Sequence, residues 1–415
     1  MKILILNAGS SSLKFQLMET DSRRIAAKGM VERIGIEGSV IKQTTGDKIY
    51  KNEQPMKDHD EAIAAMMRAL THTELGALKD MGEIAAVGHR VLHGGEKFSA
   101  SVIINEAVIE AIRENIPLGP LHNPANLMGI LACRRIMPDT PQVAVFDTSF
   151  HQTMPKKAYL YGIPTEYYKR LKIRRYGFHG TSHRYVSARV CQFLGINPIG
   201  TRIITCHLGN GSSLAAVVDG KCVDTSMGLT PLEGVLMGTR SGSLDPAVVQ
   251  FIANSEGLTC DAVLDILNKK SGLIGVSGVS SDMRDIDAAA DSGNEDAIVA
   301  RDMLAYSIKK YIGAYAAAMG GVDVLVFTAG IGENNWALRR RVMEDMEWLG
   351  VKMDFSKNDC LRAQECVISA DDSRVKVVVI PTDEEMVIAS DTLELVHCID
   401  KNTDADYNDP RFRLG

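Results

Sequence analysis

The sequence predicts an α/β protein built from two related halves. Short runs of β-branched and aromatic residues alternate with stretches of helical period, which is the pattern of layered sheets and helices. A strand–turn–strand pattern close to the N-terminus also returns near the middle of the chain. The length of 415 residues is enough for two or three domains of about 150 residues each.

Each half is expected to begin with a hairpin whose turn consists of small residues. The apolar run 2–6 leads into Asn-Ala-Gly-Ser-Ser-Ser at 7–12, and alternating residues at 13–18 form the returning strand. The same design occupies 203–218, and aligning Ser12 with Ser213 gives an offset of 201 residues. This offset is close to half of the chain, so the sequence predicts an internal duplication.

Three short runs of β-branched or aromatic residues predict further strands, at 143–146, 322–327 and 375–380. Helices are expected between them. Ser182 is a candidate N-cap for a helix that ends at Leu194 and is closed by Gly195.

A long amphipathic helix is expected over 296–319. Its apolar face is predicted to consist of Val299, Met303, Ile308, Ile312 and Tyr315. Asn334 or Asn335 can cap the helix that follows. The segment 401–415 is polar and has little to bury, so we expect a loose tail.

Composition excludes several classes of protein. The net charge of -6 and the pI near 6.0 argue against a nucleic-acid binder, which normally presents a basic face. No apolar run approaches the roughly 20 residues that span a bilayer, and the run 3–6 is too short for a signal peptide. A cytoplasmic location is therefore expected.

The cysteines and histidines do not predict a zinc site or a disulfide framework. The eight cysteines are scattered without a C-x-x-C pair, and the ten histidines are similarly dispersed. Any metal is therefore expected to bind through oxygen ligands.

Three loops rich in small residues could bind phosphate, at 7–12, 207–213 and 328–334. Glycine allows the backbone to approach a ligand, and successive N–H groups can then surround an anion. Each loop alone is more simply read as a turn, and none matches the Walker pattern. Their joint occurrence favours a phosphate-binding role. Lys14 follows the first turn and could reach a phosphate, although an exposed strand lysine is the simpler interpretation.

Two arginines beside glycines are candidates for binding carboxylate or phosphate oxygens. Arg90 lies within Gly88-His89-Arg90-Val91-Leu92-His93-Gly94-Gly95, and Arg240 lies within Met237-Gly238-Thr239-Arg240-Ser241-Gly242. The alternative for each is a surface arginine in a loop.

Acidic residues and a histidine follow other predicted strands. Asp147 stands at the carboxyl end of the strand 143–146, where α/β sheets place ligands. Glu384 and Glu385 follow the strand 375–380 and could bind Mg²⁺, or could be solvated. His179 lies in a loop with two arginines and another histidine, which favours an anion site as much as a structural role.

Together these motifs resemble the acetate kinase family over nearly the whole chain. The motifs that carry the resemblance are Asn7-Ala8-Gly9-Ser10-Ser11-Ser12-Leu13-Lys14, Gly88-His89-Arg90, Val145-Phe146-Asp147-Thr148-Ser149-Phe150-His151, Tyr176-Gly177-Phe178-His179-Gly180-Thr181-Ser182-His183, His207-Leu208-Gly209-Asn210-Gly211, Met237-Gly238-Thr239-Arg240-Ser241-Gly242, Gly330-Ile331-Gly332-Glu333-Asn334 and Pro381-Thr382-Asp383-Glu384-Glu385.

The resemblance implies the duplicated ribonuclease H-like fold of the sugar kinase, Hsp70 and actin superfamily, with a cleft between two domains. The N-terminal domain would comprise 1–150 joined by 383–400, and the nucleotide-binding domain 151–382, followed by the tail 401–415. The family also implies a homodimer.

The resemblance further implies a role for each site residue. Asp147, His179 and Arg240 would be catalytic, and Arg90 would hold the substrate carboxylate. The apolar pocket for the substrate methyl group would consist of Leu92, Leu121, Phe178 and Pro231. Mg²⁺, for which Mn²⁺ can substitute, would bind Asn7 and Glu384. Nucleotide contacts would come from Lys14, His207, Leu208, Gly209, Asn210, Gly211, Asp282, Met283, Arg284, Gly330, Ile331, Gly332, Glu333 and Asn334.

The implied reaction is reversible, direct in-line transfer of the γ-phosphoryl group of ATP to acetate. A carboxylate is already ionised at pH 7, so Asp147 is expected to orient other groups and not to abstract a proton. The alternatives are a propionate kinase of the same family and an ATPase of the actin or Hsp70 type. The bulk of Leu92 favours acetate. Asp383 departs from the asparagine of many relatives and could alter metal affinity.

Overall fold

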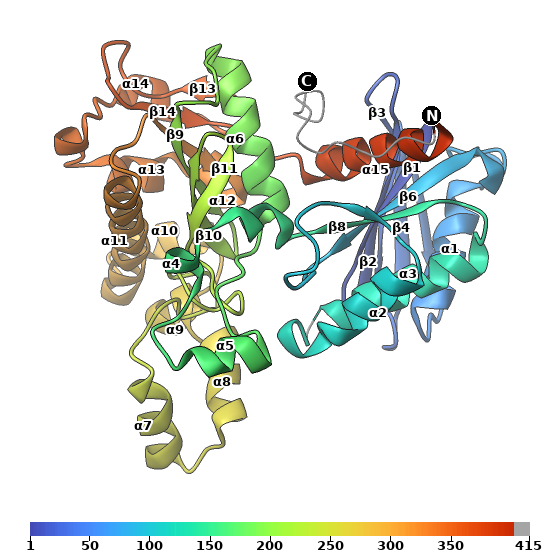
Figure 1. Ribbon diagram of the computed structural model, residues 1–415, viewed down its shortest axis with the longest axis horizontal. Helices are drawn as coiled ribbons and strands as arrows, with labels where there is room; N and C mark the ends of the chain where they lie inside the picture. Colours follow the sequence, from blue (N-terminus) through green and yellow to red (C-terminus); the bar gives the residue numbers. More distant parts are fainter. Residues whose placement is uncertain (121, 402–415) are drawn as a thin grey trace. The chain divides into compact units, whose positions relative to one another are not determined.

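The computed structural model describes residues 1–120 and 122–401, so Leu121 and most of the predicted tail lie outside the described residues. The chain divides into two compact units. Unit 1 comprises Met1–Ser149 and the segment that begins at Asp383, and unit 2 comprises Phe150–Thr382. Each unit contains one mixed sheet with helices on both faces (Figure 1).

The sheet of unit 1 has the order β5-β4-β3-β2-β1-β6-β8-β7. Strands β1 to β5 pair as successive antiparallel neighbours, whereas β6 runs parallel to β1 and β8 runs parallel to β6. The strands are β1 Lys2–Ala8, β2 Ser12–Glu19, β3 Arg24–Glu32, β4 Val40–Thr45, β5 Lys48–Glu53, β6 Ile84–Val91, β7 Val102–Ile103 and β8 Gln142–Phe146. The helices are α1 His59–Leu70, α2 Glu106–Glu114, α3 Asn123–Ile136 and α15 Glu384–Lys401, with short 3-10 turns η1 Met81–Glu83 and η2 Ile116–Leu118.

The sheet of unit 2 has the order β11-β10-β9-β12-β14-β13. Its strands are β9 Arg202–Leu208, β10 Ser212–Val218, β11 Lys221–Thr225, β12 Val324–Thr328, β13 Cys366–Val367 and β14 Lys376–Val379. Its helices are α4 Lys156–Tyr159, α5 Thr165–Leu171, α6 Gly180–Leu194, α7 Ala247–Glu256, α8 Cys260–Lys269, α9 Gly272–Ser277, α10 Met283–Asp291, α11 Glu295–Ala318, α12 Ala329–Asn334, α13 Trp336–Met343 and α14 Phe355–Asn358. The 3-10 turns are η3 Ser149–Thr153, which contains the unit boundary, and η4 Glu347–Leu349.

The two sheets share one topology, which confirms the predicted α/β class and its internal duplication. In each, three antiparallel strands are followed by two strands parallel to the first, giving β3-β2-β1-β6-β8 and β11-β10-β9-β12-β14. Strand β1 begins at Lys2 and β9 at Arg202, while β2 begins at Ser12 and β10 at Ser212. The first hairpins of the two halves are therefore 200 residues apart.

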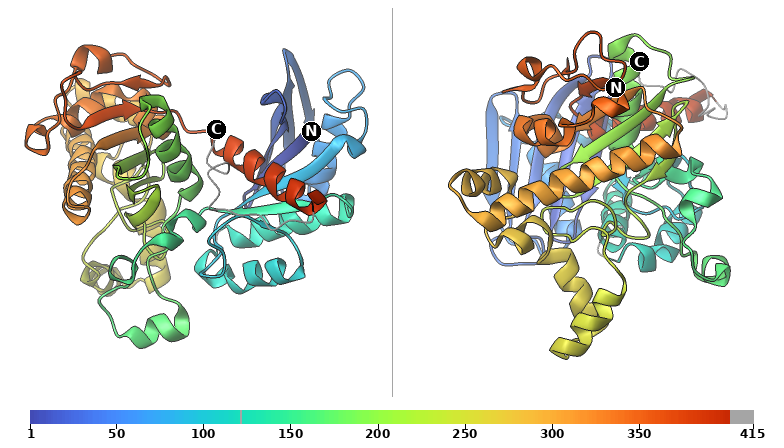
Figure 2. Two further views of the ribbon diagram at one scale, coloured as in Figure 1. Left: turned by 45° about the horizontal axis from the view of Figure 1, so that its top comes forward. Right: turned by 90° about the vertical axis from the view of Figure 1, so that its left-hand side faces the viewer.

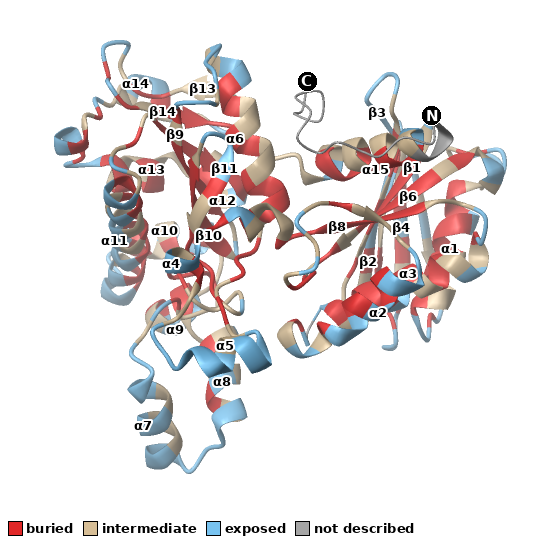
Figure 3. Ribbon diagram, viewed as in Figure 1, coloured by how far each residue is buried: buried red, intermediate tan, exposed pale blue. Residues whose placement is uncertain are grey.

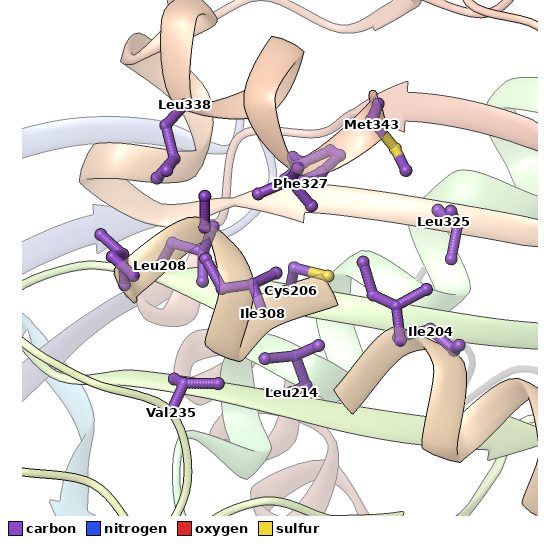
Figure 4. Packing of buried hydrophobic residues seen from close by; sticks show 14 of the residues in the cluster. Ile204, Cys206, Leu208, Leu214, Val235, Ile308, Leu325, Phe327, Leu338 and Met343 are labelled. Atoms are coloured by element: carbon purple, nitrogen blue, oxygen red, sulfur yellow. The ribbon is translucent and has the colours of Figure 1, made fainter. Parts of the chain in front are cut away.

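Each sheet is covered on both faces by apolar side chains. Figure 3 shows the buried residues concentrated along the strands and on the helix surfaces that face them. In unit 2, α11 lies along one face of the sheet (Figure 2), and Ile308 packs with Cys206, Leu214 and Phe327 (Figure 4). The other face packs against α6. Within residues 1–120 and 122–401, no helix combines the length and apolar character needed to cross a membrane.

Two helix predictions need correction. Helix α6 begins at Gly180, and its N-cap is His179 with φ 57°, so the prediction of Ser182 as the cap is wrong. Ser182 lies inside the first turn, where its hydroxyl contacts other side chains. The predicted end at Leu194 and the closing Gly195, with φ 64°, are confirmed.

The predicted apolar face of α11 is correct only in its second half. Ile308, Ile312 and Tyr315 are buried, but Val299 and Met303 are 49% and 43% exposed. Nine residues of α-helix turn the chain through two and a half turns, so Val299 lies opposite Ile308. The third predicted loop also differs, because residues 329–334 form the short helix α12. Asn335 caps α13, as one of the two predicted alternatives proposed.

Candidate active site

In unit 1, Arg90 and Asp147 form a bidentate ion pair at the carboxyl ends of neighbouring parallel strands. Arg90 lies opposite Val145 in the β6–β8 ladder, and Asp147 follows β8 directly. Arg90 Nε and Nη2 donate to the two oxygens of Asp147 at 2.9 and 2.7 Å. The Asp147 side chain is fully buried, whereas Arg90 keeps 27% of its side chain exposed. Asp147 thus fixes the guanidinium while leaving part of it open to a ligand.

Glu384 brings a second carboxylate to this pair. It is the first residue of α15, and its Oε2 lies 3.9 Å from Arg90 Nε. Burial raises the pKa of Glu384 to about 6; Asp147 and Glu385 also raise it, while Arg90 and Lys14 oppose the rise. The carboxylates exceed the local positive charge, so this position suits a divalent cation held by oxygen ligands.

The described residues contain no group of three or more His, Cys, Asp or Glu arranged to hold a metal ion. Asn7 at the end of β1 supplies a neutral oxygen and lies opposite Lys14 in the β1–β2 hairpin. Directly paired residues point to the same face of a sheet, so Lys14 and Asn7 share a face.

Buried polar side chains hold the loops of unit 1 in place, and sequence reasoning missed them. Asn126 of α3 donates to Ala8 O at 2.7 Å and accepts from the N–H of Leu92 at 3.0 Å. His59 Nε2 lies 2.8 Å from Gly9 O. These contacts tie the end of β1 to the segment after β6, so the predicted loop 7–12 and Leu92 have fixed positions.

In unit 2, His179 and Arg240 converge beside Gly211. A Cβ built on Gly211 would lie 3.2 Å from Arg240 Nη1 and 3.6 Å from His179 Nε2. Any side chain at this position would fill the space that both groups border. Glycine therefore keeps this space open where the loop 207–211 passes the two predicted catalytic groups.

Arg240 is a largely buried cation without an acidic partner in the part of the chain that the structure describes. Its Nη1 donates to Pro231 O at 3.2 Å and contacts Met237 Sδ at 3.8 Å. Burial lowers the pKa of Arg240. Because an unpaired buried charge is costly, this arrangement favours an anionic ligand.

His179 is positioned by side chains from α6 and the first hairpin of the sheet. Its ring stacks on His207, with centroids 4.1 Å apart and an interplanar angle of 22°. His179 Nδ1 lies 2.8 Å from Ser213 Oγ. His207 Nδ1 lies 2.7 Å from Ser182 Oγ, which also contacts Thr382 Oγ1 at 2.8 Å.

The segment 330–334 is fixed by the buried Arg339. All five N–H groups of Arg339 have acceptors, including Gly332 O and Glu333 O at 2.8 and 2.9 Å. The carboxylate of Glu333 accepts from the N–H of Thr382 at 3.0 Å. Gly330 remains exposed. These hydrogen bonds thus hold the backbone of the segment to which the resemblance assigns nucleotide contacts.

The other predicted nucleotide residues differ in exposure. Asp282 caps α10 and pairs with the exposed Arg284, which lowers the pKa of Asp282 to about 2. Met283 is 3% exposed and its side chain belongs to the core, so only its backbone can face a ligand. Asn210 is held by Gly238, whose N–H donates to Asn210 O at 3.0 Å.

The predicted site residues therefore fall into two groups. Unit 1 contains Asn7, Lys14, Arg90, Leu92, Asp147 and Glu384, and Leu121 lies outside the described residues. Unit 2 contains Phe178, His179, His207, Leu208, Gly209, Asn210, Gly211, Pro231, Arg240, Asp282, Met283, Arg284, Gly330, Ile331, Gly332, Glu333 and Asn334. Phe178 is buried, and its carbonyl oxygen lies 2.9 Å from His151 Nε2.

Comparison with known proteins gives consistent matches. The chain matches the model of the acetokinase family over residues 2–390. It is 55% identical over 398 residues to the acetate kinase of Bacteroides thetaiotaomicron, covering 95% of this chain and 100% of that protein. The crystal structure of Porphyromonas gingivalis acetate kinase has a TM-score of 0.92 and 51% identity, covering 95% and 99%. A propionate kinase from Francisella tularensis has a TM-score of 0.88 and 39% identity, covering 95% and 99%.

Proposed function

This chain belongs to the acetokinase family, and on that premise we propose that it transfers the γ-phosphoryl group of ATP to acetate. The products are acetyl phosphate and ADP, and the reaction is reversible. The observation that carries the proposal is the half-buried Arg240 beside His179 at Gly211, which has no acidic partner among the described residues. A guanidinium and an imidazole bordering one small space suit a transferring phosphoryl group.

We assign Arg90 to the carboxylate of the acid substrate. Its guanidinium is fixed by Asp147 on one side and remains 27% exposed. Asp147 acts by orienting Arg90, because a carboxylate substrate is ionised at pH 7 and needs no general base. Asn7 and Glu384 are the residues that would hold the divalent cation. When bound, the cation neutralises charge on the phosphates.

We assign Arg240 and His179 to the transition state, where they stabilise the charge on the phosphoryl oxygens. The loop 207–211, the start of α10 and the segment 330–334 would contact the nucleotide through backbone and side-chain groups. Lys14 would add a positive charge to the phosphates. Direct transfer needs the nucleophile aligned and water excluded, since water would otherwise hydrolyse ATP.

The substrate methyl group is assigned to Leu92, Leu121, Phe178 and Pro231. One methylene in an apolar pocket changes binding by only about 1–3 kcal/mol, so selection between acetate and propionate will be graded. The similarity to a solved propionate kinase makes propionate the second candidate substrate. On family grounds we also propose Mg²⁺ as the metal, a homodimer and a cytoplasmic location.

The test is the initial rate of acyl phosphate formation from Mg-ATP with acetate, propionate or butyrate, with a control lacking acid. We expect the highest kcat/KM with acetate and little ATP hydrolysis without acid. A preference for propionate would change the substrate and retain the mechanism. ATP hydrolysis that ignores every acid would refute the kinase assignment.

A further inference from the structure

A continuous chain of side-chain contacts leads from the sheet of unit 2 to His179. Thr205 Oγ1 lies 2.7 Å from His183 Nδ1, and His183 Nε2 lies 2.8 Å from Ser213 Oγ. Ser213 Oγ in turn lies 2.8 Å from His179 Nδ1. Thr205, His183 and Ser213 are all 0% exposed. No water can therefore replace one of these contacts without entering the core.

These contacts cross the interface between α6 and the sheet, where they lie among apolar side chains. Thr205 pairs with Ala215 and His207 with Ser213 in the β9–β10 ladder, so their side chains share the face that packs against α6. The apolar residues of this interface include Ile203, Val217, Val186 and Val190. Burying polar side chains here is costly unless each is hydrogen-bonded, so each hydrogen of these groups is expected to have an acceptor.

The series of hydrogen bonds starts at the hydroxyl of Thr205. Its hydroxyl has one hydrogen and two neighbouring acceptors, His183 Nδ1 at 2.7 Å and Ala215 O at 3.5 Å. The longer distance lies outside the usual range for an O–H donor. Thr205 therefore donates to His183 Nδ1.

His183 accepts at one ring nitrogen and donates at the other because it is neutral. Burial lowers the pKa of His183 well below its usual range, and His151 and His207 lower it further. A neutral imidazole carries a single hydrogen. Since Nδ1 accepts from Thr205, the hydrogen is on Nε2 and is donated to Ser213 Oγ.

Ser213 then has one hydrogen left to donate, and its remaining neighbour in the chain is His179 Nδ1. A neutral His179 that accepts at Nδ1 carries its hydrogen on Nε2. This nitrogen borders the space at Gly211 that Arg240 Nη1 also borders. A hydrogen there attracts a phosphoryl oxygen, whereas a lone pair would repel it.

We propose that Ser213 is a positioning residue that fixes His179 as the Nε2–H tautomer. Thr205 and His183 orient the hydroxyl of Ser213 for this role. His179 then acts as a hydrogen-bond donor toward the phosphoryl group. The second statement rests on the proposed function, whereas the tautomer is a property of the free protein.

The test combines ¹⁵N NMR of histidine-labelled full-length protein with kinetics. The His179 nitrogens are identified by their loss in His179→Gln. We expect the wild type to show His179 protonated at Nε2, and Ser213→Ala to show a mixture of both tautomers. Ser213→Thr retains the hydroxyl and restores the wild-type spectrum. Ser187→Ala is the matched control, because it removes a buried α6 hydroxyl that donates to Arg184 O at 3.1 Å and is not part of the contacts that lead to His179.

The kinetic readout separates positioning from binding. Ser213→Ala should lower kcat by about 10- to 100-fold, as removal of a supporting partner does elsewhere, with KM for ATP and for acetate little changed. Ser213→Thr should recover most of kcat. A loss that appears only in KM would overturn the proposal.

Two spectroscopic results would also overturn it. One is a wild-type His179 protonated at Nδ1; the other is a folded Ser213→Ala protein with an unchanged His179 tautomer. If Ser213→Ala does not fold, Thr205→Val carries the test, because it removes the first hydrogen at nearly constant shape. Thr205→Val must change the tautomer of His179 as well as that of His183. If only His183 changes, the proposed series of hydrogen bonds is refuted. A protein that makes no acyl phosphate would refute the proposed function, while the NMR result would still decide the tautomer.

Discussion

At the scale of single residues, Arg240 is a half-buried cation without a counter-charge among the residues that the structure describes. Its hydrogen bond goes to the carbonyl of Pro231, and no ion pair involves it within residues 1–120 and 122–401. Such a group costs stability unless a ligand brings negative charge. The phosphoryl group of ATP is the anion that the proposed reaction would place there.

Arg240→Ala is therefore expected to reduce turnover by at least about 100-fold without unfolding the protein, since an arginine that stabilises phosphoryl charge can contribute about 10³-fold or more. Steady-state kinetics and a thermal melt measure both effects. Arg113→Ala, at a half-exposed ion pair with Glu110, is the control and should change neither. Near-wild-type turnover of Arg240→Ala would remove this residue from the mechanism.

Glu384 is a second residue whose burial works against stability. Its pKa of about 6 in the folded protein is above the ordinary value of 4.5. The unfolded chain thus ionises more readily, so the stabilising contribution is complete below pH 4.5 and is lost as the pH rises through 6. At neutral pH the ionised Glu384 destabilises the protein that lacks metal.

Glu384→Gln should consequently stabilise the metal-free protein by about 1–2 kcal/mol at pH 7.5 and nearly abolish acetyl phosphate formation. Denaturant unfolding in EDTA at pH 7.5 and pH 4.5 measures the first effect, and the difference should disappear at the lower pH. Equal stability of both proteins at pH 7.5, or retained activity, would contradict the role of Glu384.

At the scale of elements, the neighbouring strands β6 and β8 carry two successive polar contacts. His89 Nε2 lies 2.8 Å from Gln142 Oε1 in the core, and Arg90 pairs with Asp147 at the sheet edge. Burial lowers the pKa of His89 to about 4, although the contact with Gln142 opposes this shift. His89 is therefore neutral in the folded protein.

This element predicts a loss of stability in mild acid. The unfolded chain binds a proton at His89 near pH 6.5, whereas the folded chain does so only near pH 4. The free energy of unfolding should thus fall by about 1–2 kcal/mol between pH 7 and pH 5 from this residue. Comparing urea unfolding of the wild type and His89→Gln at pH 7 and at pH 5 isolates the contribution of His89. An identical pH dependence in the two proteins would show that His89 does not contribute.

Elements were predictable where a local pattern determines them. The hairpin of β1 and β2 follows from alternation and a turn of small residues, and Gly195 ends α6 because a left-handed residue is needed there. Ser182 shows the limit. Its place in the chain resembles a cap, but its hydroxyl contacts His207 and Thr382, which only the tertiary fold brings near.

For the candidate site, the sequence provides predictions of single residues. Glycine-flanked arginines and residues at strand ends led to the candidates Arg90, Asp147 and Arg240, whose roles stay predictions. Their supporting side chains were missed, because burial of a polar group depends on distant partners. One signal was present: in Ile203-Ile204-Thr205-Cys206-His207, polar residues alternate with apolar ones on a strand that is otherwise apolar. Ser213 continues that polar face on the next strand.

At the scale of the whole molecule, the two units share a topology but differ in how many segments of the sequence form them. Unit 2 is one continuous segment, 150–382, with its own core between sheet and helices. Unit 1 is formed from both ends of the chain. Its sheet needs α15, whose Ile388, Ala389 and Leu395 cover apolar residues of β1 and β8.

Residues 150–382 are accordingly expected to fold alone, with a cooperative thermal transition and native-like circular dichroism. Residues 1–149 alone should aggregate or remain partly unfolded, since one sheet face is uncovered. Adding 383–401 through a flexible linker should restore a cooperative transition. A stable, monomeric 1–149 fragment would show that α15 is dispensable for the core of unit 1.

The position of α15 in the chain also has a consequence for biosynthesis. A ribosome makes the strands of unit 1 first, but the helix that covers them emerges only after all of unit 2 has been synthesised. At about 5–20 residues per second, the 233 residues between Ser149 and Asp383 delay that helix by roughly 10 to 50 seconds. The nascent β1, β6 and β8 strands therefore remain substrates for chaperones throughout that interval, while unit 2 can already be complete on the ribosome.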